Sequence, residues 1–117
     1  MPGSVLVVDD DPDQLELRAL ILEGHGHTVS AAASAEEAIE RLDGHRAVVM
    51  DLRLPTAAEG RRLITAINAA APQVPIVVLS GFPQDITGHP EEALVRCVLA
   101  KPVRSESLVA MLNSLLL

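Results

Sequence analysis

A short apolar run that ends in a carboxylate is the feature that most constrains this chain. Residues 47–50 (Ala-Val-Val-Met) are typical of a buried strand, and Asp51 follows them directly. Pro55 and the Thr-Ala-Ala-Glu-Gly stretch behind it do not continue a strand, so Asp51 is predicted to face a loop at the strand's C-terminal end. Ligands bind at that edge of open parallel sheets. A single Asp there could equally cap a turn, but other strand-like runs of this chain also end in polar groups.

Strand-like runs alternate with helical patterns along the chain. The strands are expected at residues 5–8, 28–32, 47–50, 76–79 and 96–100. This alternation predicts an α/β fold, a doubly wound sheet of five parallel strands. Because Pro83, Gly88 and Pro90 interrupt the stretch before the last strand, a fourth helix there is expected to be short or irregular.

Capping residues and apolar spacing locate the other helices. Asp11 and Pro12 begin the first helix, which ends near Gly24, and Ser34 with Glu37 predicts a capping box for the second. The expected apolar stripes of the four helices are, in order, Leu15, Ala19 and Leu22; Ala35, Ala38, Ile39 and Leu42; Leu63, Ala66, Ile67 and Ala70; and, from about Ser105 onward, Leu108, Val109, Met111, Leu112, Leu115 and Leu116. The last stripe could support dimerisation, although packing in the core explains it equally well.

Length, charge and cysteine content limit the function. The 117 residues suit one domain, residues 1–117. A net charge of −7 without a basic cluster argues against direct nucleic-acid binding. The single cysteine, Cys97, excludes an internal disulfide and suits a reducing compartment. No apolar run is long enough for a signal peptide or a membrane span, so a cytoplasmic location without membrane contact is expected.

Three carboxylates are predicted to meet at one edge of the sheet. Asp9 and Asp10 follow the first strand, Asp51 follows the third, and Asp11 is accounted for as a helix cap. Adjacent acids repel one another unless a cation offsets their charge. An all-oxygen cluster suits Mg²⁺, which takes a few carboxylates and keeps several waters. The alternative is a solvated acidic loop without a metal.

Two further polar groups follow the fourth and fifth strands. Ser80 supplies a hydroxyl, although a Ser before Gly81 could simply begin a turn. Lys101 is the only lysine in the chain, against eight arginines, so its place at a strand end is informative. A carboxylate, a divalent ion, a hydroxyl and an ammonium together predict an aspartyl-phosphate site. Asp51 would attack phosphorus while the metal, Ser80 and Lys101 neutralise the phosphoryl oxygens.

The four strand ends together resemble the receiver domain of two-component response regulators over essentially the whole chain. The matching segments are Val-Leu-Val-Val-Asp9-Asp10-Asp-Pro, Val-Val-Met-Asp51-Leu-Arg-Leu-Pro55, Val-Val-Leu-Ser80-Gly and Leu-Ala-Lys101-Pro102. The resemblance implies strand order 2-1-3-4-5 and phosphoryl transfer to Asp51 from a histidine kinase or histidine phosphotransfer domain. It also implies Mg²⁺ at Asp9, Asp10, Asp51 and the backbone carbonyl of Arg53, with Ser80 and Lys101 responding to the phosphoryl group. Such a domain catalyses only its own phosphotransfer and dephosphorylation, and an output domain or effector protein is a further possible partner.

Two departures from the receiver pattern concern the signalling elements. The loop glycine after Asp51, here Gly60, comes one residue later than is usual in the family. Val98 occupies the position at which the family often carries an aromatic switch residue, and the only aromatic residue of the chain is Phe82. Phosphorylation is therefore expected to act by remodelling residues 81–95 instead of by rotating a ring.

Two other functions fit parts of the pattern. The first is a pseudo-receiver, a protein-interaction module that keeps the fold without phosphorylation. The second is an aspartate phosphatase of the haloacid dehalogenase type, with Asp9 and Asp11 as its paired acids. That family needs a further acidic pair after its lysine, and only Glu106 follows Lys101.

Overall fold

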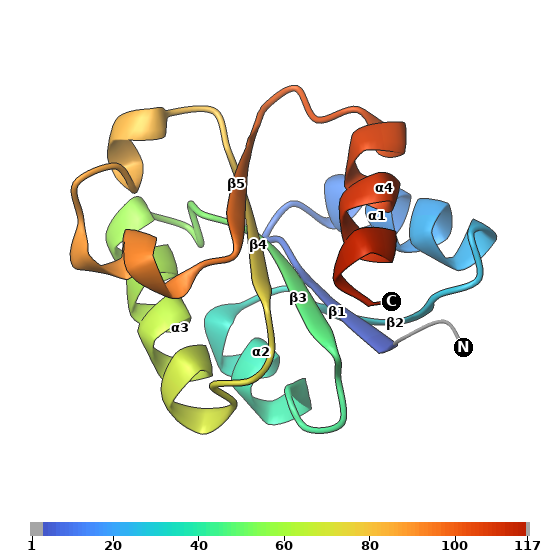
Figure 1. Ribbon diagram of the computed structural model, residues 1–117, viewed down its shortest axis with the longest axis horizontal. Coiled ribbons are helices and arrows are strands. Elements are labelled where there is room, and N and C mark those ends of the chain that lie inside the picture. The colour runs from blue at the N-terminus through green and yellow to red at the C-terminus, as the bar shows by residue number, and fades with distance from the viewer. Residues whose placement is uncertain (1–3, 117) are drawn as a thin grey trace.

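The computed structural model describes residues 4–116, which form a five-stranded sheet between two layers of helices (Figure 1). The strands are β1 (Ser4–Val8), β2 (Thr28–Ala32), β3 (Ala47–Asp51), β4 (Ile76–Ser80) and β5 (Cys97–Ala100). All neighbouring strands pair in parallel, in the order β2-β1-β3-β4-β5. The predicted fold class and strand order are confirmed. Among the described residues, no helix combines the length and apolarity needed to cross a membrane.

The helices are α1 (Pro12–Gly24), α2 (Ala35–Arg41), α3 (Ala57–Ala70) and α4 (Ser105–Leu115). Figure 1 shows α1 and α4 on one face of the sheet and α2 and α3 on the other. Each face has its own apolar cluster, because the side chains of a buried parallel strand alternate between the two faces. Every residue of β3 up to Met50 and every residue of β4 is buried, which places the core at the centre of the sheet.

Side chains that cap the first turn explain where α1, α2 and α3 begin. The Asp11 carboxylate accepts hydrogen bonds from the amides of Asp13 and Gln14, and Pro12 occupies the first helical position of α1. Ser34 caps α2 through the Glu37 amide, as predicted. In a capping box the Glu37 carboxylate would accept a hydrogen bond from the amide of the cap residue, Ser34. Here it accepts instead from the amide of Ala33, one residue before the cap.

Thr56 caps α3 in the same way, through the amide of Glu59. The predicted stripe of α3 is partly wrong: Ala66 and Ala70 are exposed, and the helix buries Gly60 and Ile64 beside Leu63 and Ile67. On α2, Ile39 was expected in the core and is 41% exposed. The predicted stripe of α4 does face the sheet, with Leu108, Val109 and Leu112 buried.

The chain between β4 and β5 contains two short 3-10 turns, η1 (Pro83–Asp85) and η2 (Pro90–Leu94), where a helix would otherwise continue the alternation. The prediction of a short or irregular fourth helix is thus confirmed. Proline begins both turns, and Gly88 between them has a φ of 82°, a value that residues with a side chain rarely adopt. Ile86 anchors the segment in the core at 1% exposure.

Candidate functional site

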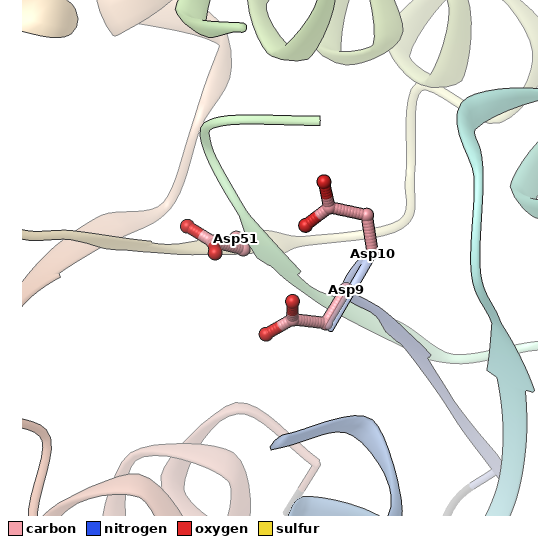
Figure 2. A group of neighbouring side chains, drawn as sticks. All are labelled: Asp9, Asp10 and Asp51. Carbon is pink, nitrogen blue, oxygen red and sulfur yellow. The ribbon is translucent and has the colours of Figure 1, made fainter. Parts of the chain in front are cut away.

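Three carboxylates converge where β1 and β3 end (Figure 2). Asp9 and Asp10 directly follow β1, and Asp51 is the last residue of the neighbouring strand β3. One carboxylate oxygen from each of the three residues lies within 4.8 Å of the others. The cluster predicted from the sequence is therefore brought together, with Asp9 buried, Asp51 half-buried and Asp10 exposed.

The donor set of this cluster fits Mg²⁺. It supplies carboxylate oxygens only, the ligands that this hard cation prefers over nitrogen or sulfur. Asp10 is exposed, so the cluster is open to solvent on one side, where a metal would keep its waters. Arg53, whose carbonyl the resemblance implies as a further ligand, lines the small cavity next to Asp51.

Lys101 reaches Asp51 from the far side of β4. Its ammonium Nζ lies 2.9 Å from Oδ2 of Asp51, and the two side chains are 34% and 14% exposed. β5 ends at Ala100, so the order of the strands carries Lys101 to the same edge as the acids. The ammonium therefore lies where it could also pair with an oxygen of a phosphoryl group attached to Asp51.

Ser80 ends β4 and is buried at 4% exposure. Its hydroxyl donates to the carbonyl oxygen of Phe82 at 3.0 Å and accepts from the Phe82 amide at 3.1 Å. Ser80 also lines a cavity of about 110 Å³ with Asp51 and Lys101, among others. The three residues predicted to handle a phosphoryl group thus border one small space. The Ser80 hydroxyl forms hydrogen bonds with the backbone of Phe82, as it would if Ser80 simply began a turn before Gly81.

Arg53 joins the two loops that border this cavity. Its Nε donates to Oδ2 of Asp85 at 2.8 Å, and its guanidinium carbon lies 3.9 Å from the centroid of the Phe82 ring. Arg61 adds a hydrogen bond of 2.6 Å to the carbonyl oxygen of Asp85. The loop after β3 is thereby tied to the loop after β4.

The same contacts shift the titration of two side chains. The hydrogen bond from Arg53, followed by the attraction of its charge, lowers the pKa of Asp85, although partial burial opposes this. In return, Asp85 raises the pKa of Arg53. Outside the site, burial raises the pKa of the Cys97 thiol, with a smaller opposite effect from Arg96.

Gly60 sets the distance between α3 and the loop after β3. A Cβ atom at this position would lie 1.6 Å from the carbonyl oxygen of Leu52, so α3 packs directly on the backbone between Asp51 and Arg53. Glycine is required here for the close approach and not for an unusual φ. Gly60, the glycine that comes one residue later than is usual in the family, therefore allows α3 to pack against the backbone of the site.

Sequence reasoning missed two groups near the site. Arg18 forms an ion pair with the buried Asp9, and Asp85 holds Arg53. The signal for Arg18 was available, because it lies between Leu15 and Leu22 on the apolar side of α1, where a charged residue needs a buried partner. Asp85 lies in the irregular segment 81–95 and carries no comparable pattern.

Comparisons with known proteins agree with this geometry. Residues 5–113 match the family model described as response regulator receiver domain. Transcriptional regulatory protein GlrR of Escherichia coli is 32% identical over 111 residues, which are 92% of this chain and 24% of GlrR. Protein PilH of Pseudomonas aeruginosa is 29% identical over 119 residues, 96% of each chain. The chain thus spans about a quarter of the length of GlrR and nearly all of PilH.

Solved structures of similar sequence share the fold. A response regulator receiver domain (CheY-like) from Methylobacillus flagellatus superposes with a TM-score of 0.86 at 28% identity and covers 98% of this chain and 99% of its own. NtrX from Brucella abortus gives a TM-score of 0.88 at 26% identity, covering 99% of this chain and 27% of its own. With its sheet order, its acidic strand ends and the match over residues 5–113, the chain belongs to the family of response regulator receiver domains.

Proposed function

We propose that this receiver domain accepts a phosphoryl group on Asp51 from a histidine kinase or a histidine phosphotransfer domain, in the cytoplasm and with Mg²⁺. The observation that carries the proposal is the position of the Asp51 carboxylate, between the two other acids of the cluster and the ammonium of Lys101 at 2.9 Å. A receiver domain is not a conventional enzyme, and its own phosphoryl group is the only one that it would turn over.

The chain's own groups account for the transfer. An oxygen of Asp51 attacks phosphorus, a new O–P bond forms, and the P–N bond to the donor imidazole breaks, with its electron pair left on the imidazole nitrogen, which is then protonated. Lys101 already lies at the attacking carboxylate and would pair with a phosphoryl oxygen. Mg²⁺ held by Asp9, Asp10, Asp51 and the Arg53 carbonyl would neutralise negative charge on the acids and on the phosphoryl oxygens.

Ser80 has to exchange one hydrogen bond for another. Its hydroxyl donates to the carbonyl oxygen of Phe82, so it must leave that acceptor before it can donate to a phosphoryl oxygen. Because the amide of Phe82 also donates to Ser80, the turn from Ser80 to Phe82 is expected to rearrange together with the hydroxyl. This links the state of Asp51 to residues 81–95.

Intact-mass measurement tests the proposal. Incubated with Mg²⁺ and a small phosphodonor such as acetyl phosphate, the protein should gain the mass of one phosphoryl group. Asp51→Asn should abolish the gain, and Asp43→Asn, a change of the same charge on an exposed loop, should leave it intact. An unchanged mass for the unmodified chain, with metal binding verified, would favour the pseudo-receiver.

Membership of the receiver family argues against the haloacid dehalogenase-type phosphatase. Turnover of free phosphate esters by the chain would reinstate that alternative. An output domain or a separate effector protein remains part of the proposal for a receiver domain that matches only 24% of GlrR.

A further inference from the structure

Arg18 is the only buried arginine among the described residues. It is 9% exposed, whereas the other arginines and Lys101 are half-buried or exposed. Its position on α1 places it between Leu15 and Leu22, which pack in the apolar cluster of that face. A guanidinium in such surroundings needs a charged partner, and Arg18 finds it in Asp9, nine residues earlier in the chain.

The pairing engages a carboxylate of the acidic cluster. Asp9 is 1% exposed and uses both of its oxygens: Oδ1 accepts the amide of Asp11 at 2.9 Å, and Oδ2 accepts Nη1 of Arg18. A carboxylate offers about four lone-pair positions, so Asp9 keeps acceptor capacity for a metal or for a water bound to it. A cation bound there would share Asp9 with the positive charge of Arg18.

We propose that Arg18 is a built-in counter-cation of the acidic site, which stabilises the three carboxylates when no divalent cation is bound and weakens the binding of Mg²⁺. The proposal rests on the proposed function, because that function places the metal at these carboxylates. With Lys101 at Asp51 and Arg18 at Asp9, two positive charges face three negative ones, so Asp10 is the one carboxylate of the cluster without a salt bridge among the described residues. Mg²⁺ must then bind against the field of a guanidinium that shares its ligand.

The structure also has space into which Arg18 could withdraw. Arg18 lines a cavity of about 500 Å³ between α1 and α4, whose walls include Gln14, Lys101, Arg104 and Ser105. Gln14 and Ser105 carry side-chain oxygens that can accept hydrogen bonds from a guanidinium. Lys101 and Arg104 on the same walls carry like charge and oppose this withdrawal, which adds to the cost of binding a metal at Asp9.

The test compares Mg²⁺ affinity in two charge-matched variants of the full chain. Amide NMR titration with Mg²⁺ gives the dissociation constant for the unmodified protein, for Arg18→Met and for Arg104→Met. Arg104 lines the same cavity, and the described residues provide it with no salt-bridge partner. Arg18→Met should bind Mg²⁺ more tightly, by a factor on the order of 10, and Arg104→Met should stay within about twofold of the unmodified chain because exposed charges are screened.

Thermal unfolding gives a second readout. Without divalent ions, Arg18→Met should melt below the unmodified chain, since Asp9 keeps a buried charge without its partner. Added Mg²⁺ should then raise its melting temperature more than that of the unmodified chain. An unchanged or weaker Mg²⁺ affinity in Arg18→Met would overturn the proposal, and so would an equal gain in Arg104→Met, which would reflect net charge alone.

The unmodified protein keeps the test decisive if Arg18→Met does not fold. During the titration, the side-chain Nε–Hε resonance of Arg18 should shift with the same midpoint as the amides of Asp10 and Asp51, and an unshifted resonance would contradict the proposal. No phosphodonor is present in these measurements. A chain that gains Mg²⁺ affinity through Arg18→Met but is never phosphorylated on Asp51 supports the role of Arg18 and refutes the phosphoacceptor proposal. A chain that is phosphorylated on Asp51 but gains no Mg²⁺ affinity supports the phosphoacceptor proposal and refutes the role of Arg18.

Discussion

The guanidinium carbon of Arg53 lies 3.9 Å from the centroid of the Phe82 ring. This stacking joins the loop after β3, which carries Arg53, to the loop after β4, which carries Phe82. Asp85 holds the same guanidinium through an ion pair of 2.8 Å. Phe82 is 46% exposed, so the stacking does not bury the ring in the core, and its backbone holds the hydroxyl of Ser80. Phe82 thus contacts both the hydroxyl of Ser80 and the guanidinium of Arg53.

The ion pair between Arg53 and Asp85 should make stability depend on pH in the acid range. Because Arg53 lowers the pKa of Asp85 in the folded protein, the stabilisation is fully present above the unfolded-state pKa of about 3.9 and is lost as the pH falls through the lowered value. Urea unfolding of the unmodified chain and of Asp85→Asn should therefore differ by a constant amount between about pH 5 and pH 7 and converge in stronger acid.

Arg53→Met provides the control for this dependence. It should return the pKa of Asp85 toward the ordinary range, which ¹³C NMR of the side-chain carboxyl measures directly. A carboxyl of Asp85 that titrates at the same pH in both proteins would show that Arg53 does not hold it.

Removal of a metal ligand should abolish the response to Mg²⁺. The exposed Asp10 belongs to the three-carboxylate cluster, so millimolar Mg²⁺ should raise the melting temperature of the unmodified chain by mass action. Asp10→Ala should lose this rise, and its metal-free form should melt at or above the unmodified protein because one repelling charge is gone. Asp43→Ala, an exposed change of equal charge, should keep the full response. A melting curve of the unmodified chain that Mg²⁺ leaves unaltered would mean that the metal site is wrong.

A methyl group on Gly60 should destabilise the fold at the site. The new Cβ would lie 1.6 Å from the Leu52 carbonyl oxygen, and neither backbone can yield without moving α3 or the loop after Asp51. Gly60→Ala should cost about 3 kcal/mol, the upper end for overpacking, as measured by urea unfolding. At Gly24 no atom lies within 4 Å of the corresponding position, so Gly24→Ala should change stability by less than about 1 kcal/mol. Equal stabilities of the two variants would contradict the proposed packing.

The sequence predicted the sheet and the edge that carries the site, because both depend on local patterns. Continuous β-branched runs mark strands buried on both faces, and parallel pairing then carries the residues at their ends to one edge. Capping residues located the starts of α1 and α2 for the same reason. The prediction for α3 was wrong at Ala66 and Ala70, which are exposed. Exposing the small side chain of alanine costs little free energy, so an alanine does not indicate which face of a helix is buried.

Long-range partners account for most of what the sequence did not predict. The partner of Arg18 lies nine residues earlier, before the start of α1, and Asp85 is 32 residues from Arg53. Nothing in a local pattern tells which distant carboxylate an arginine will meet. A charged residue within the apolar stripe of α1 is a signal for a buried partner that the sequence prediction did not use, and the signal does not identify that partner.

The last prediction concerns the route by which the signal leaves the site. Val98 has no ring to rotate and is 37% exposed, and Ser80 is bound to Phe82, which in turn lies under Arg53. When Ser80 turns toward a phosphoryl group, it gives up its hydrogen bond to the carbonyl oxygen of Phe82, so we expect the stack and residues 82–95 to rearrange. This segment contains only short 3-10 turns, so its rearrangement does not require a regular α-helix to unfold. Amide NMR spectra with and without beryllofluoride, which mimics the phosphoryl group, should show shifts across 82–95. Phe82→Leu, which removes the ring but keeps the backbone, should leave the shifts at Ser80 and reduce those at Arg53. Shifts confined to the surroundings of Asp9, Asp51 and Lys101 would refute this route.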